Sequence, residues 1–344
     1  MKKFYHTLSN CLAISETGGV IAERRNDCSN GKNDTRINGG MLFRRVFVIW
    51  TIIIVTIIVA GCESNIDSLP ENSTPPKNPE RIISTTPSIT ELLFEIGLGN
   101  KIVGDCQFTT YPPETAKIEK IGGLYDRNNE KIISLNPDVV IFSVEDVQFE
   151  KKLSQLGIGH LAVDHRSISG LLDSYELVGK LFGGNCLEQA IAKRHEFEEF
   201  LHDCKSQTEG LKRLRVLAVI DRQHGTGRIS NVFIAGSELF FSEVLNLAGG
   251  ENVAANVGLP YPGITTEAII DFNPDIIIDI QATPENDKST ENLSRADWDT
   301  IKDVVPAIKK GNVFIIVDNY ASIPGPRIPL LIKKLREILD SCRD

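Results

Sequence analysis

Motifs that would signal catalysis are missing from this 344-residue sequence. It has no Gly-x-x-x-x-Gly-Lys-Ser/Thr phosphate loop, no Gly-x-Ser-x-Gly nucleophile elbow and no His-Glu-x-x-His metal motif. The chain also lacks an excess of basic residues, since 37 Lys and Arg against 46 Asp and Glu leave a formal charge of -9. Because a nucleic-acid-binding protein needs a basic footprint, this charge argues against a nucleic-acid partner.

Methionine is also scarce, and its positions bear on where the natural chain starts. Met1 and Met41 are the only two methionines. Residues 1–40 are polar without periodicity, whereas Met41 opens a basic segment that is followed by an apolar run. This order is typical of a secretory signal peptide, and the run is short for a membrane span of about 20 residues. We interpret residues 41–61 as the signal peptide and residues 1–40 as a non-native extension; a single transmembrane anchor is the alternative.

A cysteine directly follows this expected signal peptide. The sequence Val59-Ala60-Gly61-Cys62 resembles the lipobox of bacterial lipoproteins, in which the signal is cut before the cysteine and the sulfur is acylated. This resemblance implies a lipid anchor on Cys62. The next segment, residues 62–79, is rich in Pro, Ser and Asn, which predicts a flexible tether between the lipid and the body.

Metal-binding patterns are weak in the remaining chain. The other cysteines have no zinc-like spacing and their pairing stays open; they are Cys106, Cys186, Cys204 and Cys342. The spacing of His195, Glu199 and His202 places all three on one helix face, so a divalent metal site is an alternative. Glu196 and Glu198 lie beside them, which favours an ordinary solvated face.

The body of the chain is expected to form two lobes joined by a helical segment. Short apolar strands alternate with helices along residues 80–166 and again along residues 211–344, which is typical of an α/β fold with parallel-rich sheets. Apolar residues recur at helical spacing in residues 167–210, with an interruption at Gly183-Gly184-Asn185. We predict that one long helical stretch joins the lobes stiffly and that a ligand cleft lies between them.

The first helix of the N-terminal lobe carries a start signal. Ser88 is followed three residues later by Glu91, the spacing of a capping box. We therefore predict Ser88 as the N-cap of a helix from Ile89 to Ile96, with Glu91 reaching back to the cap.

An internal repeat gives the strongest functional signal. The segments Glu130-Lys-Ile-Ile-Ser-Leu-Asn-Pro-Asp-Val-Val-Ile141 and Glu267-Ala-Ile-Ile-Asp-Phe-Asn-Pro-Asp-Ile-Ile-Ile278 share a glutamate, an Ile-Ile pair and an Asn-Pro-Asp turn at identical spacing. A carboxylate at the start of a short helix is favoured by the helix dipole by about 0.3–1 kcal/mol, which would explain either glutamate alone. Two matched copies instead indicate contacts with a symmetric partner through carboxylate–arginine bonds.

Aromatic side chains stand in loops that follow the expected strands. Such positions suit a flat or apolar ligand in a cleft, although local packing of each loop is the alternative. These residues are Phe108, Tyr111, Tyr125, Tyr261 and Tyr320.

Short motifs in both lobes accompany the repeat. They are the segment from Pro79 to Glu91, Tyr111-Pro-Pro-Glu114, Ile121-Gly-Gly123, Leu247-Ala-Gly-Gly-Glu-Asn252 and Gly325-Pro-Arg-Ile328. Over about residues 79–339, these motifs and the repeat resemble the ABC-importer substrate-binding proteins whose lobes are joined by a backbone helix. That class binds vitamin B12, ferric siderophores or haem, and it has neither a catalytic activity nor a cofactor of its own.

The resemblance implies roles for particular residues. In the family, one glutamate per lobe docks onto arginines of the two permease subunits, and the matching positions are Glu130 and Glu267. Family ligand contacts come from loops at the lobe interface. The positions expected there are Phe108, Tyr125, Tyr261 and Tyr320.

The ligand that this resemblance implies is a large metal chelate. We expect a corrinoid. A ferric siderophore and haem are alternatives, because two positions depart from the pattern of the vitamin B12-binding members: Leu124 replaces a tryptophan, and Ser143 stands where an aromatic residue is expected. A divalent metal ion is a further alternative. The receptor is expected to be a lipid-anchored monomer in the periplasm or on the outer face of the cell membrane.

Overall fold

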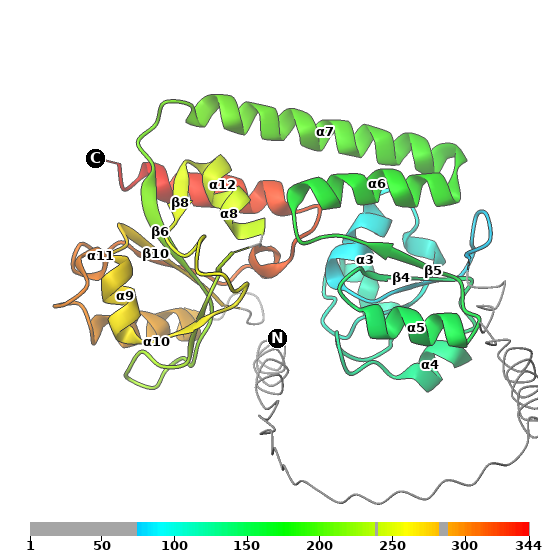
Figure 1. Cartoon of the computed structure of the whole chain (residues 1–344), viewed down its shortest axis with the longest axis horizontal. Helices are drawn as coiled ribbons and strands as arrows, with labels where there is room; N and C mark the ends of the chain where they lie inside the picture. The colour runs from blue at the N-terminus through cyan, green and yellow to red at the C-terminus, as the bar shows by residue number, and fades with distance from the viewer. Residues whose placement is uncertain (1–73, 238–239, 282–287, 344) are drawn as a thin grey trace, which may run out of the picture. The chain divides into compact units, whose positions relative to one another are not determined.

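The computed structural model describes residues 74–237, 240–281 and 288–343 (Figure 1). The expectations for residues 1–40, for the signal peptide and for Cys62 lie outside the described residues, as does most of the tether. In the part of the chain that is described, no helix is long and apolar enough to cross a membrane. The four cysteines in that part are free thiols.

The N-terminal lobe contains a five-stranded sheet in which every strand pair is parallel, in the order β3-β2-β1-β4-β5. Its central strand β1 is fully buried, as expected for a parallel sheet covered on both faces. The strands are β1 (Ile82–Ser84), β2 (Ile102–Asp105), β3 (Glu119–Lys120), β4 (Val139–Ser143) and β5 (His160–Val163). The helices of this lobe are α3 (Pro87–Glu95), α4 (Asn129–Ser134) and α5 (Val147–Gln155), with 3-10 turns η2 (Gly99–Lys101) and η3 (Pro113–Lys117).

The C-terminal lobe contains a mixed sheet in the order β11-β10-β6-β7-β9, with β8 pairing with β6. The pairs of β6 with β8 and β10, and of β10 with β11, are parallel, whereas those of β7 are antiparallel. The strands are β6 (Leu214–Asp221), β7 (Val232–Ile234), β8 (Gly250–Asn252), β9 (Gly263–Ile264), β10 (Ile276–Ile280) and β11 (Val313–Ile316). The helices are α8 (Phe240–Ala248), α9 (Thr266–Phe272), α10 (Lys288–Asp299), α11 (Pro306–Lys309) and α12 (Ile328–Asp340), with 3-10 turn η4 (Asn319–Ser322). The two-lobe α/β fold expected from the sequence is confirmed.

Two helices, rather than one stretch, join the lobes. Helix α6 (Ile168–Phe182) follows β5, and α7 (Gly184–Thr208) packs along it and continues to β6 (Figure 1). The chain reverses at Gly183 and Gly184, whose φ angles of 66° and 50° lie in the left-handed region that glycine adopts without strain. The predicted interruption at these glycines is therefore a hairpin between two helices.

The largest hydrophobic cluster runs through both lobes. It joins buried residues of β1 and α3 to those of α6, α7, α8 and α12 without a break. Two smaller clusters lie elsewhere, one on the first sheet around Phe142 and one on the second sheet around Trp298. Because a shared core opposes separation of the parts that it joins, this cluster agrees with a stiff connection between the lobes.

The capping box predicted at Ser88 is wrong. Helix α3 begins at Pro87, and the N-cap is Thr86, whose hydroxyl accepts a hydrogen bond from the backbone N–H of Ile89 at 3.4 Å. Proline is favoured at the first helical position because its ring already has a helical φ and no N–H is needed there. Ser88 therefore lies inside the helix, and the Glu91 side chain is directed to the other lobe.

Candidate functional site

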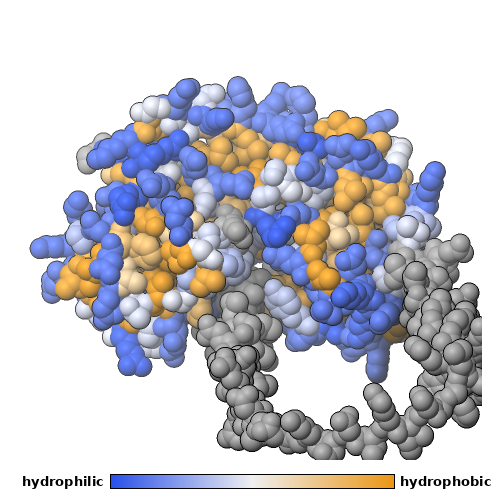
Figure 2. Space-filling model, in the orientation of Figure 1, coloured by the Kyte–Doolittle hydropathy of each residue, from blue (hydrophilic) through white to orange (hydrophobic). Residues whose placement is uncertain are grey.

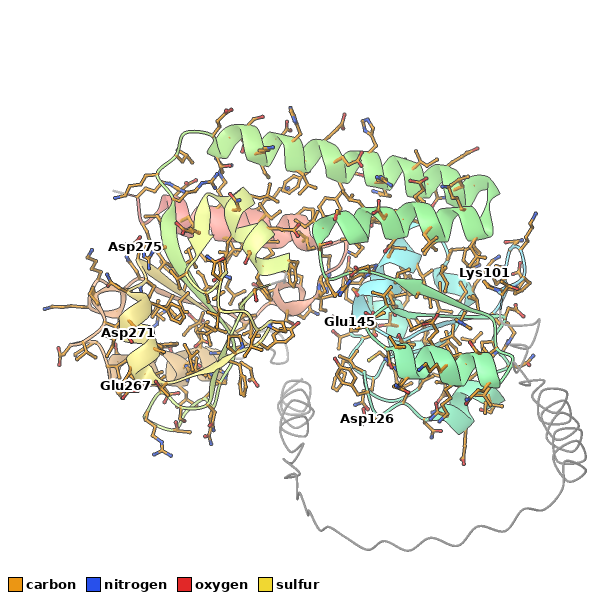
Figure 3. All side chains as sticks on the ribbon, viewed as in Figure 1. Lys101, Asp126, Glu145, Glu267, Asp271 and Asp275 are labelled. Atoms are coloured by element: carbon orange, nitrogen blue, oxygen red, sulfur yellow. The ribbon has the colours of Figure 1, made fainter. Side chains whose placement is uncertain are left out.

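The repeat places Glu130 and Glu267 at equivalent positions of two short helices. Each is the second residue of its helix, α4 or α9, and each side chain is exposed. Figure 3 labels Glu267 on the surface of α9. The N-caps also match, since Asn128 accepts a hydrogen bond from the third helical N–H of α4 at 3.0 Å and Thr265 from that of α9 at 3.4 Å. The Glu267 backbone N–H, and then the Thr265 hydroxyl, lower the pKa of the Glu267 carboxyl.

The scaffold beneath the two glutamates is also duplicated. Asp138 in the first Asn-Pro-Asp turn accepts the backbone N–H of Arg81 at 2.9 Å, and Asp275 in the second turn accepts that of Arg215 at 2.9 Å. Arg81 directly precedes β1, and Arg215 is the second residue of β6, the first strand of the C-terminal lobe. These bonds hold the turn that follows each short helix against the first strand of the same lobe. The short helix is therefore placed in the same way relative to the sheet in both lobes.

The same two arginines also form hydrogen bonds with carbonyl groups at the C-terminal ends of the short helices. Their Nη2 groups donate to the carbonyl oxygens of Leu135 and Phe272, each at 2.6 Å. The next residues, Asn136 and Asn273, have φ angles of 45° and 42°, a left-handed conformation that asparagine tolerates at the end of a helix. The Asn-Pro-Asp part of the repeat is therefore structural, and the glutamate is its exposed and chemically available part.

Two of the predicted ligand-binding aromatics come together from opposite lobes. Tyr261 precedes β9 in the C-terminal lobe, and Tyr125 lies between β3 and α4 in the N-terminal lobe. Burial raises the pKa of the Tyr261 phenol, and the Glu145 carboxylate and Tyr125 add to this effect. Figure 3 shows Glu145 on the side of the N-terminal lobe that faces the C-terminal lobe. The Tyr261 phenol is therefore close enough to Glu145 and Tyr125 of the other lobe for their charges to act on it, and Tyr125 is 53% exposed.

The remaining predicted aromatics lie in two further loops. Phe108 is half-buried in the turn after β2, and Tyr320 is half-buried in η4. Burial, followed by the nearby Asp318 carboxylate, raises the pKa of Tyr320 to about 12. Tyr111, which is 43% exposed, lies against Arg327, with 4.2 Å between the guanidinium carbon and the ring centre, and the Tyr320 ring lies 5.9 Å from the same carbon.

Sequence reasoning missed the ion pair that anchors this arginine. Arg327 donates from Nε and Nη2 to the two carboxylate oxygens of Glu91, at 2.9 and 2.6 Å. Glu91 belongs to the N-terminal lobe and Arg327 to the C-terminal lobe, so the pair spans the lobe interface. Both residues stood in the motifs quoted from the sequence, but the local spacing around Glu91 suggested a helix cap instead of a distant partner.

The histidine-containing stripe on α7 faces solvent. The ring nitrogen Nδ1 of His195 lies 3.6 Å from a Glu199 carboxylate oxygen, and both side chains are about 70% exposed. His202 is exposed as well. Hydrophilic residues predominate along this edge of the molecule in Figure 2. Among the residues that the structure describes, no group of three or more His, Cys, Asp and Glu side chains is arranged to hold a metal ion.

Two surface cavities lie in the N-terminal lobe. One, of about 540 Å³, is beside the C-terminal ends of α4 and α5, and the other, of about 530 Å³, is beside β5 and the start of α6. None of the predicted ligand-binding aromatics lines either cavity. The assignment of the ligand site to these aromatics therefore stays a prediction.

Comparison with known proteins identifies the family. Residues 82–320 match the model of the periplasmic binding protein family. An uncharacterized ABC transporter substrate-binding lipoprotein of Bacillus subtilis, YvrC, is 29% identical over 280 residues, which cover 80% of this chain and 83% of that protein. The vitamin B12-binding protein of Vibrio parahaemolyticus is 26% identical over 266 residues, which cover 77% of this chain and 90% of that protein.

Solved structures agree with this family assignment. The vitamin B12-binding protein BtuF of Vibrio cholerae superposes with a TM-score of 0.68 at 23% identity, covering 78% of this chain and 100% of that one. The haem-binding protein RhuT of a Roseiflexus species gives a TM-score of 0.64 at 22% identity, covering 77% and 99% of the two chains. These relatives are solute-binding proteins and not enzymes. The chain therefore belongs to the periplasmic binding protein family, as its motifs predicted, and is a solute-binding protein rather than an enzyme.

Proposed function

We propose that the protein is the lipid-anchored receptor of an ABC importer, and that it captures a corrinoid outside the cytoplasm and presents it to the permease. The matched positions of Glu130 and Glu267 carry this proposal. A carrier that docks on a two-subunit permease needs one contact surface in each lobe, and the repeat supplies one exposed carboxylate per lobe on the same scaffold. Carboxylate–arginine bonds are charge-assisted and frequently bidentate, so two of them suffice to orient the receptor.

The relatives support both the transport role and the anchor. The Bacillus subtilis relative is described as an ABC transporter substrate-binding lipoprotein, which agrees with lipidation of Cys62. Replacement of Cys62 by alanine should move the protein from the membrane fraction to the soluble fraction of cells, because acylation needs the sulfur. Retention of the variant in the membrane fraction would favour the transmembrane alternative. We expect the anchored receptor to be a monomer.

The ligand assignment rests on aromatic chemistry and on the vitamin B12-binding relatives. Tyr125 and Tyr261 supply one phenol from each lobe, and the two groups act on one another electrostatically, which suits a large ligand with a flat apolar ring system and polar edges. We propose that Phe108 and Tyr320 take part in the same site from their neighbouring loops.

Haem is the second candidate, and the tyrosines again favour it. A tyrosine oxygen is one of the side-chain groups that hold haem iron in proteins, and Tyr125 is exposed. A ferric siderophore fits less well, because such ligands are often anionic and the chain is acidic. The Arg327 guanidinium, which lies against the Tyr111 and Tyr320 rings, is already paired with Glu91.

A titration with three probes separates these candidates. Purified protein is mixed with cyanocobalamin, haemin or a ferric hydroxamate, and binding is followed by calorimetry and by the ligand absorbance. We expect saturable 1:1 binding of cyanocobalamin, weakened by Tyr261→Ala but not by His195→Ala on the solvent face of α7. Tight binding of haemin alone, with an iron–phenolate absorbance band, would show that the ligand is haem and not a corrinoid.

A further inference from the structure

A second repeat lies in one helix of each lobe, α3 and α8. Thr90-Glu91-Leu-Leu-Phe-Glu-Ile-Gly97 on α3 and Ser242-Glu243-Val-Leu-Asn-Leu-Ala-Gly249 on α8 share a hydroxyl residue, a glutamate, an apolar pair and a glycine at identical spacing. Both glycines end their helix with a positive φ, 80° for the first and 94° for the second. The two glutamates therefore occupy equivalent places in the two lobes.

Glu91 crosses from the N-terminal lobe to the start of α12. Its carboxylate receives two hydrogen bonds from the guanidinium of Arg327, the residue that directly precedes α12. The side chains are only 2% and 13% exposed, so the charges are largely removed from water. In this environment a bidentate pair fixes both the distance and the orientation of the two groups.

Glu243 crosses in the opposite direction, to the start of α6. Its carboxylate accepts the backbone N–H of Ile168, the first residue of that helix, at 3.1 Å. The first N–H groups of a helix have no partner within the helix and carry partial positive charge, so a carboxylate from the other lobe suits this position. Helix α6 follows the last strand of the first sheet, and α12 follows the last strand of the second sheet. The two glutamate contacts are therefore made at equivalent positions of the two lobes.

Arg327 also contacts residues in the loops of the predicted ligand site. Its Nη1 donates to the Asn319 side-chain oxygen at 2.6 Å, and the Asn319 amide donates to the Thr110 hydroxyl of the other lobe at 3.1 Å. The guanidinium also lies against the rings of Tyr111 and Tyr320. One arginine therefore contacts residues of both lobes.

Close packing around this arginine leaves little room for adjustment. A Cβ added to Gly325 would lie 3.3 Å from the Cα and Cβ atoms of Ser88 and 3.4 Å from a carboxylate oxygen of Glu91. The segment before α12 thus approaches α3 at a distance that a larger residue would disturb. This approach places the Arg327 guanidinium within reach of Glu91.

We propose that Glu91 and Glu243 form a reciprocal lock that sets the relative position of the two lobes, and that Arg327 is a positioning residue that holds the Tyr111 and Tyr320 rings at the lobe interface. The lock stands independently of any ligand. Its effect on ligand binding rests on the function proposed above.

Hydrogen–deuterium exchange on the full mature chain tests the lock without a ligand. Arg327→Lys keeps the charge but loses the bidentate geometry of the pair, and Glu91→Gln leaves the Arg327 charge without its partner. Each variant should therefore speed exchange in the peptides around Thr110 and Asn319 by about tenfold or more. Glu243→Ala should speed exchange at the Ile168 amide in the opposite lobe, and Glu243→Gln, which keeps an acceptor oxygen, should restore part of the protection. Arg336→Lys is the matched control, because Arg336 lies on the same helix α12 but bonds to Gln207 of α7, and this variant should leave both regions unchanged.

A double-mutant cycle distinguishes a specific interaction between Glu91 and Arg327 from a general loss of stability in each variant. The effects of Glu91→Gln and Arg327→Gln on the unfolding midpoint should be strongly non-additive, because the second change removes the charge that the first leaves unpaired. Additive effects, or exchange that rises only in the lobe carrying the substitution, would overturn the proposal.

Ligand binding then distinguishes this inference from the proposed function. With cyanocobalamin as the probe, Arg327→Lys should weaken binding by about tenfold, chiefly through faster dissociation, since the tyrosine rings lose their support. If the wild-type protein binds no cyanocobalamin but the exchange results hold, the proposed ligand fails and the lock stands. If the probe binds Arg327→Lys as tightly as the wild type, the positioning role of Arg327 is refuted.

Discussion

Tyr261 of the C-terminal lobe and Glu145 of the N-terminal lobe interact across the lobe interface, and the carboxylate helps to raise the pKa of the phenol. Burial is the larger cause and the Glu145 charge adds to it. This relationship places two loops that are far apart in the sequence at one site. A pH titration of the Tyr261 phenol therefore reports on how the two lobes are arranged.

Glu145→Gln should therefore lower the pKa of Tyr261. The substitution removes a negative charge that disfavours the phenolate, while the burial of the ring stays the same. A pH titration of the protein with 13C-labelled tyrosine, assigned with Tyr261→Phe, measures the change. Glu150→Gln, on the exposed surface of α5, is a control that should leave the Tyr261 titration unaltered. An unchanged titration in Glu145→Gln would show that the two residues do not face each other in solution.

Asp138→Ala and Asp275→Ala should destabilise the protein to a similar extent, by about 1–3 kcal/mol each. Both carboxylates accept the backbone N–H of the arginine at the start of the adjacent strand, and alanine leaves that group without its acceptor. Urea unfolding measures the loss. Asp340→Ala on the surface of α12 serves as the control, since an exposed ion pair contributes little. A large effect in one lobe and none in the other would contradict the structural equivalence of the repeats.

The repeat shows how much of the fold could be read from the sequence. Within the two α/β regions that the sequence predicts, the repeat forms a short helix followed by a buried strand in each lobe, α4 with β4 and α9 with β10. Local patterns suffice for such elements, because a continuous apolar run and an Asn-Pro-Asp turn specify them within a dozen residues.

Contacts between distant residues could not be predicted in this way. Glu91 and Arg327 are 236 positions apart, and no local pattern indicates that they meet. The capping-box spacing at Ser88 matched a local rule, but the helix starts at Pro87, two residues earlier than predicted, and leaves Glu91 free to reach the other lobe. The reversal between α6 and α7 was likewise hidden, because a helix hairpin and an interrupted helix have the same apolar periodicity on both sides of Gly183.

Acidification should destabilise the protein through His165. This histidine is buried, its Nδ1 lies 2.9 Å from the Ser88 hydroxyl, and burial lowers the pKa of its ring from 6.5 to about 4. As the pH falls from about 6.5 towards about 4, His165 binds a proton in the unfolded state but stays neutral in the folded state. The unfolded state is therefore favoured, and the stability present above about pH 6.5 is lost over this range. The shift corresponds to at most about 3 kcal/mol.

Unfolding by urea at about pH 7 and about pH 4.5 checks this expectation. The wild type should lose more stability between the two values than His165→Gln, whose side chain does not titrate. His160→Gln is a matched control, because that ring is only partly buried and lies in the same lobe. Equal pH dependence in the wild type and in His165→Gln would show that another group is responsible.

Uptake of the ligand by cells tests the proposed role of the two carboxylates most directly. The double variant Glu130→Ala with Glu267→Ala is compared with the wild type and with Glu114→Ala and Glu251→Ala, two exposed glutamates that lie outside the repeat. The account predicts that the double variant folds, binds the ligand with unchanged affinity and yet stops transport, while each single repeat variant weakens it. Transport by the double variant at the wild-type rate would contradict the assignment of Glu130 and Glu267 as the two permease contacts.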